Sequence, residues 1–256
     1  MGSIPSDRSE SDVPQPNHRP SVAMIHGAGG GVWEYRFWRR AFEDAGWLVF
    51  GADLQPGPLG LARTSLADYR RQVLGWPPSG EPPDAVIGAS MGGWLALHAA
   101  AAWRAKALVL INPVPPHGVE AAWNPPEPIP EVVAWSQSTL DETARALPDA
   151  EPEVVRWASR KWRDESGLVL RELAAGAEAP RPRCPTLVIV SELDADVPPQ
   201  TALAVARWCG AEAITIPGAS HVGPLLGRSA SCCAALTLDW IQRQIPSHAR
   251  RERDHQ

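Results

Sequence analysis

The sequence predicts an α/β fold, in which helices flank a mainly parallel, twisted β-sheet. Short apolar runs alternate with helix-like stretches along most of the chain, a pattern typical of parallel strands joined by crossover helices. A length of 256 residues suits one such domain with a small insertion and allows a large buried core. Polar or glycine-rich segments directly follow several of the apolar runs, so the candidate functional residues fall at strand ends.

Each element follows from its own stretch of sequence. Continuous apolar runs, such as residues 186–190, predict buried strands. Six strands are expected, at about 20–26, 47–52, 84–89, 106–111, 185–191 and 211–216. Helices are expected near 32–45, 66–75, 91–104, 198–209 and 229–244. Because little chain precedes residue 20, one or two antiparallel strands at the N-terminal edge of the sheet are expected to be missing.

A serine turn is the most informative motif. Residues 88–92 are Gly-Ala-Ser-Met-Gly, and they lie between an apolar strand-like run and an alanine-rich helical stretch. In this context the turn projects the serine hydroxyl from the sheet edge, where the helix N-terminus helps to stabilise negative charge. Gly88 and Gly92 are needed because a side chain there would collide with neighbouring backbone. The motif predicts that Ser90 is a nucleophile; the alternative is a serine that only shapes a turn or caps a helix.

Three further segments follow predicted strands. His26 and a glycine-rich run to residue 31 come after the first strand, where a backbone N–H can approach a substrate oxygen closely. Asp194 follows the strand at 185–191, and His221 follows the strand at 211–216. The order Ser, Asp, His, with each residue after a strand, is that of a catalytic triad on this kind of sheet.

Together these motifs resemble those of the α/β-hydrolase superfamily. The matching segments are HGAGGG, GASMGG, SELDADVPP and PGASHVG, and the resemblance covers roughly residues 20–245. The roles that it implies are a nucleophile at Ser90, a general base at His221, an orienting carboxylate at Asp194, and an oxyanion hole formed by the backbone N–H groups of Ala28 and Met91.

Two aspartates compete for the role of the acid. In the family pattern the acid precedes x-x-Val-Pro, which is the position of Asp194, whereas Asp196 directly precedes Val197. The carboxylate must accept a hydrogen bond from the imidazole and hold the correct tautomer. Asp194 is therefore the expected acid, and Asp196 is the alternative.

The family inserts a cap after the strand that here ends near Asn112. The chain between this strand and the strand at 185–191 is longer than one crossover helix requires. Helical stretches fit there around 131–136, 138–146, 151–163 and 165–176. The resemblance thus implies a small helical cap at about 117–165. Its entry is rich in proline, which favours a stiff, extended strap across the mouth of the site.

Tryptophan is unusually frequent, with 12 Trp against 3 Phe and 2 Tyr. Indoles around a pocket favour flat or apolar substrates. Ordinary packing is the alternative for most of these side chains. The residues expected to contact the substrate are Gly29, Trp33, Trp94, His117, Trp123 and Trp135.

Composition argues against several classes of partner. The net charge is −5 and no basic stripe occurs, so no nucleic-acid partner is expected. No run of about 18 apolar residues occurs, so no membrane partner is expected either. The first residues are polar and proline-bearing, unlike a signal peptide, which predicts a cytoplasmic protein. We expect a disordered lead at 1–19, one domain at 20–246 and a disordered tail at 247–256.

Cysteine usage and the motifs indicate neither a metal nor a cofactor. The four cysteines lack the spacing of metal ligands, so free thiols in a reducing cytoplasm are expected. No basic cluster marks a phosphate or coenzyme A handle. The expected partner is a small apolar or aromatic molecule, and the oligomeric state is left open.

Two functions remain after these exclusions. The leading hypothesis is a cofactor-independent serine hydrolase that acts on an ester or related acyl group of a small, largely apolar molecule. The alternative is a lyase or cyclase of the same fold, such as the superfamily members that eliminate acetate from an acetylated intermediate in bacterial natural-product pathways. A base and an oxyanion hole serve both chemistries, so the motifs leave the choice open. A catalytically inactive binding module is disfavoured, because such proteins usually lose the serine or the histidine.

Overall fold

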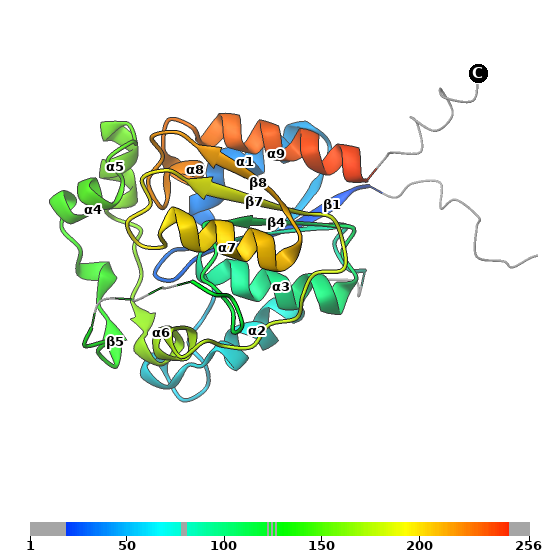
Figure 1. Cartoon of the computed structure of the whole chain (residues 1–256). Helices are drawn as coiled ribbons and strands as arrows, with labels where there is room; N and C mark the ends of the chain where they lie inside the picture. The colour runs from blue at the N-terminus through cyan, green and yellow to red at the C-terminus, as the bar shows by residue number, and fades with distance from the viewer. Residues whose placement is uncertain (1–18, 78–80, 122, 124, 126, 246–256) are drawn as a thin grey trace, which may run out of the picture.

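The computed structural model describes residues 19–77, 81–121, 123, 125 and 127–245. Its centre is a six-stranded parallel sheet with the strand order β2-β1-β3-β4-β7-β8 (Figure 1). The strands are β1 (Ser21–Ile25), β2 (Leu48–Phe50), β3 (Ala85–Ala89), β4 (Ala107–Ile111), β7 (Thr186–Ser191) and β8 (Glu212–Ile216). All six strands expected from the apolar runs are present. Within the described residues this sheet has no antiparallel strand, and β2 lies at its edge.

The register aligns the carboxyl ends of the four central strands. Ile25 lies beside Gly88, at the ends of β1 and β3. Ala89 lies beside Ile111, and Ile111 lies beside Ile189 on β7. The residues that follow these strands therefore meet at one edge of the sheet, which is where ligands bind in open parallel sheets.

Helices cover both faces of the sheet (Figure 1). One face packs against α1 (Arg36–Asp44), α8 (Gly223–Leu226) and α9 (Ala230–Gln244), and the other against α2 (Leu66–Leu74), α3 (Met91–Trp103) and α7 (Pro199–Cys209). Successive strand residues point to opposite faces, so Ile87 packs with the first group and Val86 with the second. Burial on both faces explains why the four central strands consist mainly of apolar residues.

The segment between β4 and β7 departs from the prediction at three points, one of which is that the helix expected at 151–163 ends at Ala158. It contains η3 (Trp135–Gln137), α4 (Leu140–Ala146), α5 (Pro152–Ala158) and α6 (Gly167–Ala174), and α4 and α5 lie beyond the carboxyl ends of β7 and β8 (Figure 1). The helix expected at 131–136 is instead β5 (Val132–Val133) followed by the η3 turn, and the helix expected from 165 begins only at 167. The reason is a short antiparallel pairing of β5 with β6 (Glu165–Ser166), after which the Ser166 hydroxyl caps α6.

The helix expected at 32–45 is also subdivided, because it opens with the 3-10 turn η1 (Val32–Tyr35) before α1 begins. The predicted lead, apart from residue 19, and the predicted tail at 247–256 lie outside the described residues. None of the described helices is long and apolar enough to span a membrane.

Candidate active site

Ser90 occupies a strained turn between β3 and α3. Its backbone has φ 53° and ψ −121°, a conformation that residues with a side chain rarely adopt. The flanking glycines leave no room for a side chain: a Cβ on Gly88 would lie 2.1 Å from the Gly92 oxygen, and one on Gly92 would lie 2.3 Å from the Ile25 oxygen. Strain retained at one serine, between a buried strand and a helix, is typical of a nucleophile turn.

His221 is held by Asp194. The imidazole Nδ1 lies 2.7 Å from Asp194 Oδ2, and the Asp194 side chain is fully buried. The other carboxylate oxygen, Oδ1, accepts the backbone N–H groups of Asp196 at 2.9 Å and Val197 at 2.8 Å. Because the carboxylate accepts, Nδ1 carries the hydrogen and the Nε2 lone pair is left to act as a base. Asp196, the alternative acid, is exposed and takes part through its backbone.

The electrostatics of His221 balance burial against negative charge. Burial alone lowers the pKa of the imidazole, because it penalises the charged form. The hydrogen bond to Asp194 and the negative charges of Asp194 and Asp196 outweigh burial, so the pKa of His221 lies above its ordinary value. The environment thus favours the imidazolium that forms when the histidine takes a proton.

Asn112 is a site residue that the sequence did not single out. It follows β4, is buried, and has φ 44°. Its amide nitrogen donates to Ser191 Oγ at 2.8 Å and to the His221 carbonyl at 2.7 Å, while its oxygen accepts the Ser191 N–H at 2.8 Å. Asn112 therefore ties the ends of β4 and β7 to the backbone of His221. Its polar side chain directly after an apolar strand was the available signal.

A cavity of about 510 Å³ opens beside these residues. Ser90, His221, Ala28 and Met91 all line it, so the structure brings together the candidate nucleophile, base and oxyanion-hole residues. Trp123 and Trp135 line it as well, as expected. Other apolar side chains in its wall are Trp162, Leu170, Leu173, Val197 and Leu225.

Four residues expected to contact the substrate do not belong to the described lining of this cavity. Trp33 packs edge-on against Trp157 and Trp162, with ring centroids 5.4 and 5.1 Å away. Trp94 is buried against the sheet, and its indole N–H donates to the Ala177 oxygen at 3.2 Å. His117 leaves 63% of its side chain exposed. Gly29 borders a second, smaller cavity together with Leu61 and Glu165.

Glu34 is a carboxyl group in the cavity wall that no sequence pattern marked. It lies on η1, is only 4% exposed, and lines the same cavity as Ser90 and His221. Its Oε2 atom has no hydrogen-bond partner within the described part of the chain. Burial raises the pKa of Glu34 to about 8, against the lowering effects of nearby backbone N–H groups and His221. The carboxyl is therefore mainly protonated at neutral pH.

His26, in the loop after β1, has a structural role. His26 is buried, its Nδ1 lies 2.8 Å from the Gly27 oxygen, and its Nε2 accepts the Leu54 N–H at 2.9 Å. Burial lowers the pKa of His26 to about 4, so it is neutral and links two loops.

Asp194, Asp196 and His221 are the described side chains whose ligand atoms lie close enough together to hold a metal ion. Both oxygens of Asp194 are already engaged by hydrogen-bond donors, which favours the triad arrangement over a metal site.

The family follows from the sequence of the whole domain. A model of the alpha/beta hydrolase family matches residues 22–235. The chain belongs to this family. In this alpha/beta hydrolase the serine turn, the acid loop and the histidine loop all lie within the matched region. No curated protein sequence matches the chain significantly.

Solved structures share the fold of this alpha/beta hydrolase at low sequence identity. Polyneuridine aldehyde esterase is 18% identical, with a TM-score of 0.65, over 87% of this chain and 100% of its own. The monoacylglycerol lipase of Paleococcus ferrophilus is 17% identical, with a TM-score of 0.68, over 88% of this chain and 96% of its own. A variant of tomato methylketone synthase I is 12% identical, with a TM-score of 0.65, over 90% of this chain and 100% of its own. At these identities the likeness is evidence for the fold alone.

Proposed function

We propose that this alpha/beta hydrolase is a serine-dependent esterase that forms an acyl-enzyme on Ser90. One observation carries the proposal. The strained Ser90 turn and the imidazole of His221, which is hydrogen-bonded to a buried carboxylate, line the same cavity. A nucleophile, a base and a group that orients the base are the parts that acyl transfer requires.

The proposed reaction has two halves. Ser90 Oγ attacks the ester carbonyl carbon while His221 Nε2 takes the hydroxyl proton. The bond to the alcohol oxygen then breaks, His221 returns the proton to that oxygen, and the acyl group remains on Ser90. Water, deprotonated by His221, attacks the acyl carbon, and the acid leaves as Ser90 is reprotonated. The N–H groups of Ala28 and Met91 stabilise the oxyanion in each half.

The substrate that we propose is a small, largely apolar or aromatic ester. The cavity volume of about 510 Å³ lies in the range typical of small-molecule sites. Trp123, Trp135 and Trp162 supply flat apolar surface to its wall. Polar side chains interrupt this apolar wall at Glu34, Glu142 and Asp196, among others.

A fluorophosphonate probe and p-nitrophenyl esters test the nucleophile. Ser90→Ala should lower ester turnover by at least about 10³-fold, because the members of a triad act as a unit. The probe should label the wild type at Ser90 and leave the variant unlabelled. Ser136→Ala, which changes an exposed serine that does not line the cavity, is the control and should keep both labelling and turnover. Undiminished turnover in Ser90→Ala would refute the proposed mechanism.

Product analysis separates hydrolysis from the rival elimination of acetate. With an acetylated substrate, hydrolysis leaves an alcohol and passes through an acetyl-enzyme, so rapid quenching should trap acetate on Ser90. Elimination needs only a base near an acidic C–H and a stabilised oxyanion, and it yields an alkene lighter than the alcohol by one water. An alkene without a trapped adduct would assign the site to a lyase.

A further inference from the structure

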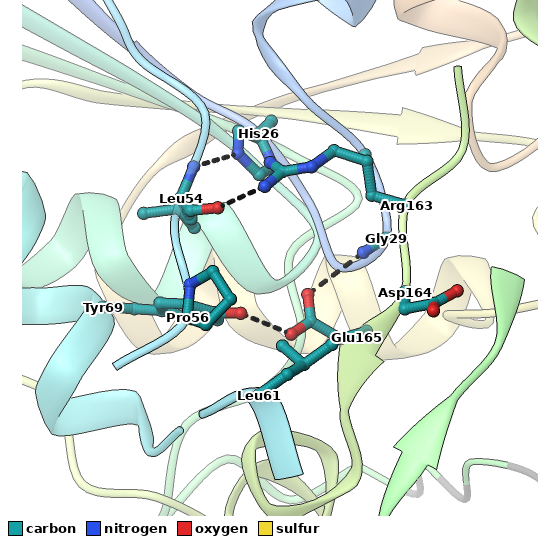
Figure 2. A pocket seen from close by; sticks show the side chains of 10 residues that line it. His26, Gly29, Leu54, Pro56, Leu61, Tyr69, Arg163, Asp164 and Glu165 are labelled. Carbon is teal, nitrogen blue, oxygen red and sulfur yellow. Dashed lines mark hydrogen bonds between the residues drawn. The ribbon is translucent and has the colours of Figure 1, made fainter. Parts of the chain in front are cut away.

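The oxyanion loop, residues 27–31, is bound from behind by the segment that enters β6. The Gly29 N–H donates to Glu165 Oε2 at 3.1 Å, and the Gly29 oxygen accepts the Arg163 N–H at 2.8 Å. Figure 2 shows the Glu165 carboxylate pointing from its strand toward the Gly29 nitrogen. Both polar backbone groups of Gly29 are therefore fixed by one short segment far away in the sequence.

The Glu165 carboxylate is itself held rigidly. Its Oε1 atom accepts the Tyr69 hydroxyl at 2.7 Å and the Ser166 N–H at 2.7 Å (Figure 2 shows the tyrosine). The residue is 3% exposed. Nearby, the Arg163 guanidinium donates to the Leu54 oxygen at 2.8 Å. Glu165 thus presents its second oxygen to Gly29 from a fixed position.

Packing alone does not hold the loop on this side. A cavity of about 180 Å³ lies between Gly29, Tyr69, Leu61 and Glu165, so the loop lacks close contacts there (Figure 2). On the other side, the ring of Trp135 is so close that a Cβ on Gly29 would lie 2.1 Å from its Cε3 atom. Gly29 has φ +66°, so the loop turns sharply at this point. Hydrogen bonds hold one side of the turn, and an indole holds the other.

We propose that Glu165 is a positioning residue for the oxyanion hole. By binding the Gly29 N–H it fixes the plane of the Ala28–Gly29 peptide, and this orients the preceding N–H of Ala28 toward the reaction space. The inference rests on the proposed function, because an oxyanion hole has an effect only if a carbonyl reacts beside Ser90. Glu165 acts through the loop, since it lies behind the loop and borders the smaller cavity.

Glu165→Gln removes the contact selectively. The glutamine has the same size, and its single oxygen can still accept from Tyr69 and Ser166. In this orientation its NH₂ group faces the Gly29 N–H and cannot accept from it, whereas the flipped amide would leave both the Tyr69 O–H and the Ser166 N–H without their acceptor. Tyr69→Phe is the matched control, because it deletes one of the other hydrogen bonds of the same carboxylate and leaves the contact with Gly29.

The test is steady-state kinetics on a p-nitrophenyl ester, with urea unfolding of each variant. Loss of a whole oxyanion donor costs about 10²–10³-fold in kcat, so a misdirected donor in Glu165→Gln should cost about 10–100-fold. KM should stay within about 2-fold, because the donor acts on the transition state more than on the bound ester. Tyr69→Phe should change kcat by less than about 5-fold. A wild-type kcat in Glu165→Gln, a loss confined to KM, or an equal loss in Tyr69→Phe would overturn the proposal.

A second readout separates this inference from the proposed function. If the wild type hydrolyses no ester, the esterase proposal fails, but the rate of fluorophosphonate labelling at Ser90 still reports on the oxyanion hole. The phosphonyl oxygen needs the same donors during attack. Labelling should slow in Glu165→Gln and stay near the wild-type rate in Tyr69→Phe. An unchanged rate in Glu165→Gln contradicts the positioning role whatever the natural substrate is.

Discussion

Replacing Glu34 by glutamine should change how stability depends on pH. In the folded protein burial raises the pKa of this carboxyl from 4.5 to about 8. An unfolded chain ionises the same group near the ordinary value. Between these two pH values the folded state holds a proton that the unfolded state has released, so the stability contributed by this site falls as pH rises. Glutamine does not titrate in this pH range, so the stability of Glu34→Gln does not fall for this reason.

The magnitude follows from the size of the pKa shift. A change from 4.5 to about 8 corresponds to about 5 kcal/mol of destabilisation once the carboxyl is ionised in both states. Most of this develops between about pH 5 and pH 8, where the wild type should lose about 3 kcal/mol relative to Glu34→Gln. The absolute stability of the variant also includes the cost of a buried amide, about 1–3 kcal/mol if it is unpaired. This cost is the same at pH 5 and at pH 8, so it cancels when the stability difference between variant and wild type is compared at the two pH values.

Urea unfolding followed by tryptophan fluorescence, at several pH values from 5 to 8, measures this difference. The free energy of unfolding of Glu34→Gln minus that of the wild type should grow steadily over the range. Glu153→Gln changes an exposed glutamate at the start of α5, and its difference from the wild type should stay nearly flat. A flat difference for Glu34→Gln as well would show that Glu34 is not held protonated, and the electrostatic argument would be wrong.

Three further results are expected. Asp194→Asn should lower kcat by about 10²–10⁴-fold through loss of the histidine tautomer, and Asp196→Asn should cost far less; the reverse order in ester assays would move the acid by two residues. Because the pKa of His221 is raised, activity should fall as pH drops through a value above the ordinary 6.5, and a pH–rate profile measures this limb. Asn112→Ala should lower the free energy of unfolding by about 2–3 kcal/mol, because it leaves buried partners unpaired; an unchanged urea midpoint would contradict this.

Local sequence patterns were sufficient to predict the strands of the sheet and the serine turn. Strands such as β7 contain an unbroken apolar run, here residues 187–190, because both of their faces are buried, so composition alone identifies them. The turn at Ser90 needs glycine at fixed offsets within five residues, and such short-range steric demands are written directly in the sequence. The order of the strands then places the residues after them at one edge.

The directions of side chains and the pairing of distant segments could not be predicted from local sequence patterns. The pairing of β5 with β6 joins two-residue strands about 30 positions apart, and so short a strand has no periodicity to detect. Glu34 and Trp33 are adjacent, yet Glu34 lines the larger cavity and Trp33 packs against the indoles of Trp157 and Trp162. Which of them faces inward depends on the 3-10 turn of η1 and on its tertiary contacts. No spacing rule in a single sequence specifies that choice.

The hydrogen bonds of Asn112 indicate which segments hold the site in place and which can be replaced in protein engineering. They join β4, Ser191 and His221 within the sheet scaffold, without a contribution from α4 or α5. The helix α4 lines the cavity and takes no part in these bonds, so a graft of foreign sequence confined to 140–146 can alter selectivity while the nucleophile and base keep their frame. Trp135 and Asp149 have to stay, because Trp135 packs against Gly29 and the Asp149 carboxylate accepts the Ser220 hydroxyl beside His221. The helix α4 is thus the part that can be redesigned for a new substrate, and the segments on either side of it have to be inherited intact.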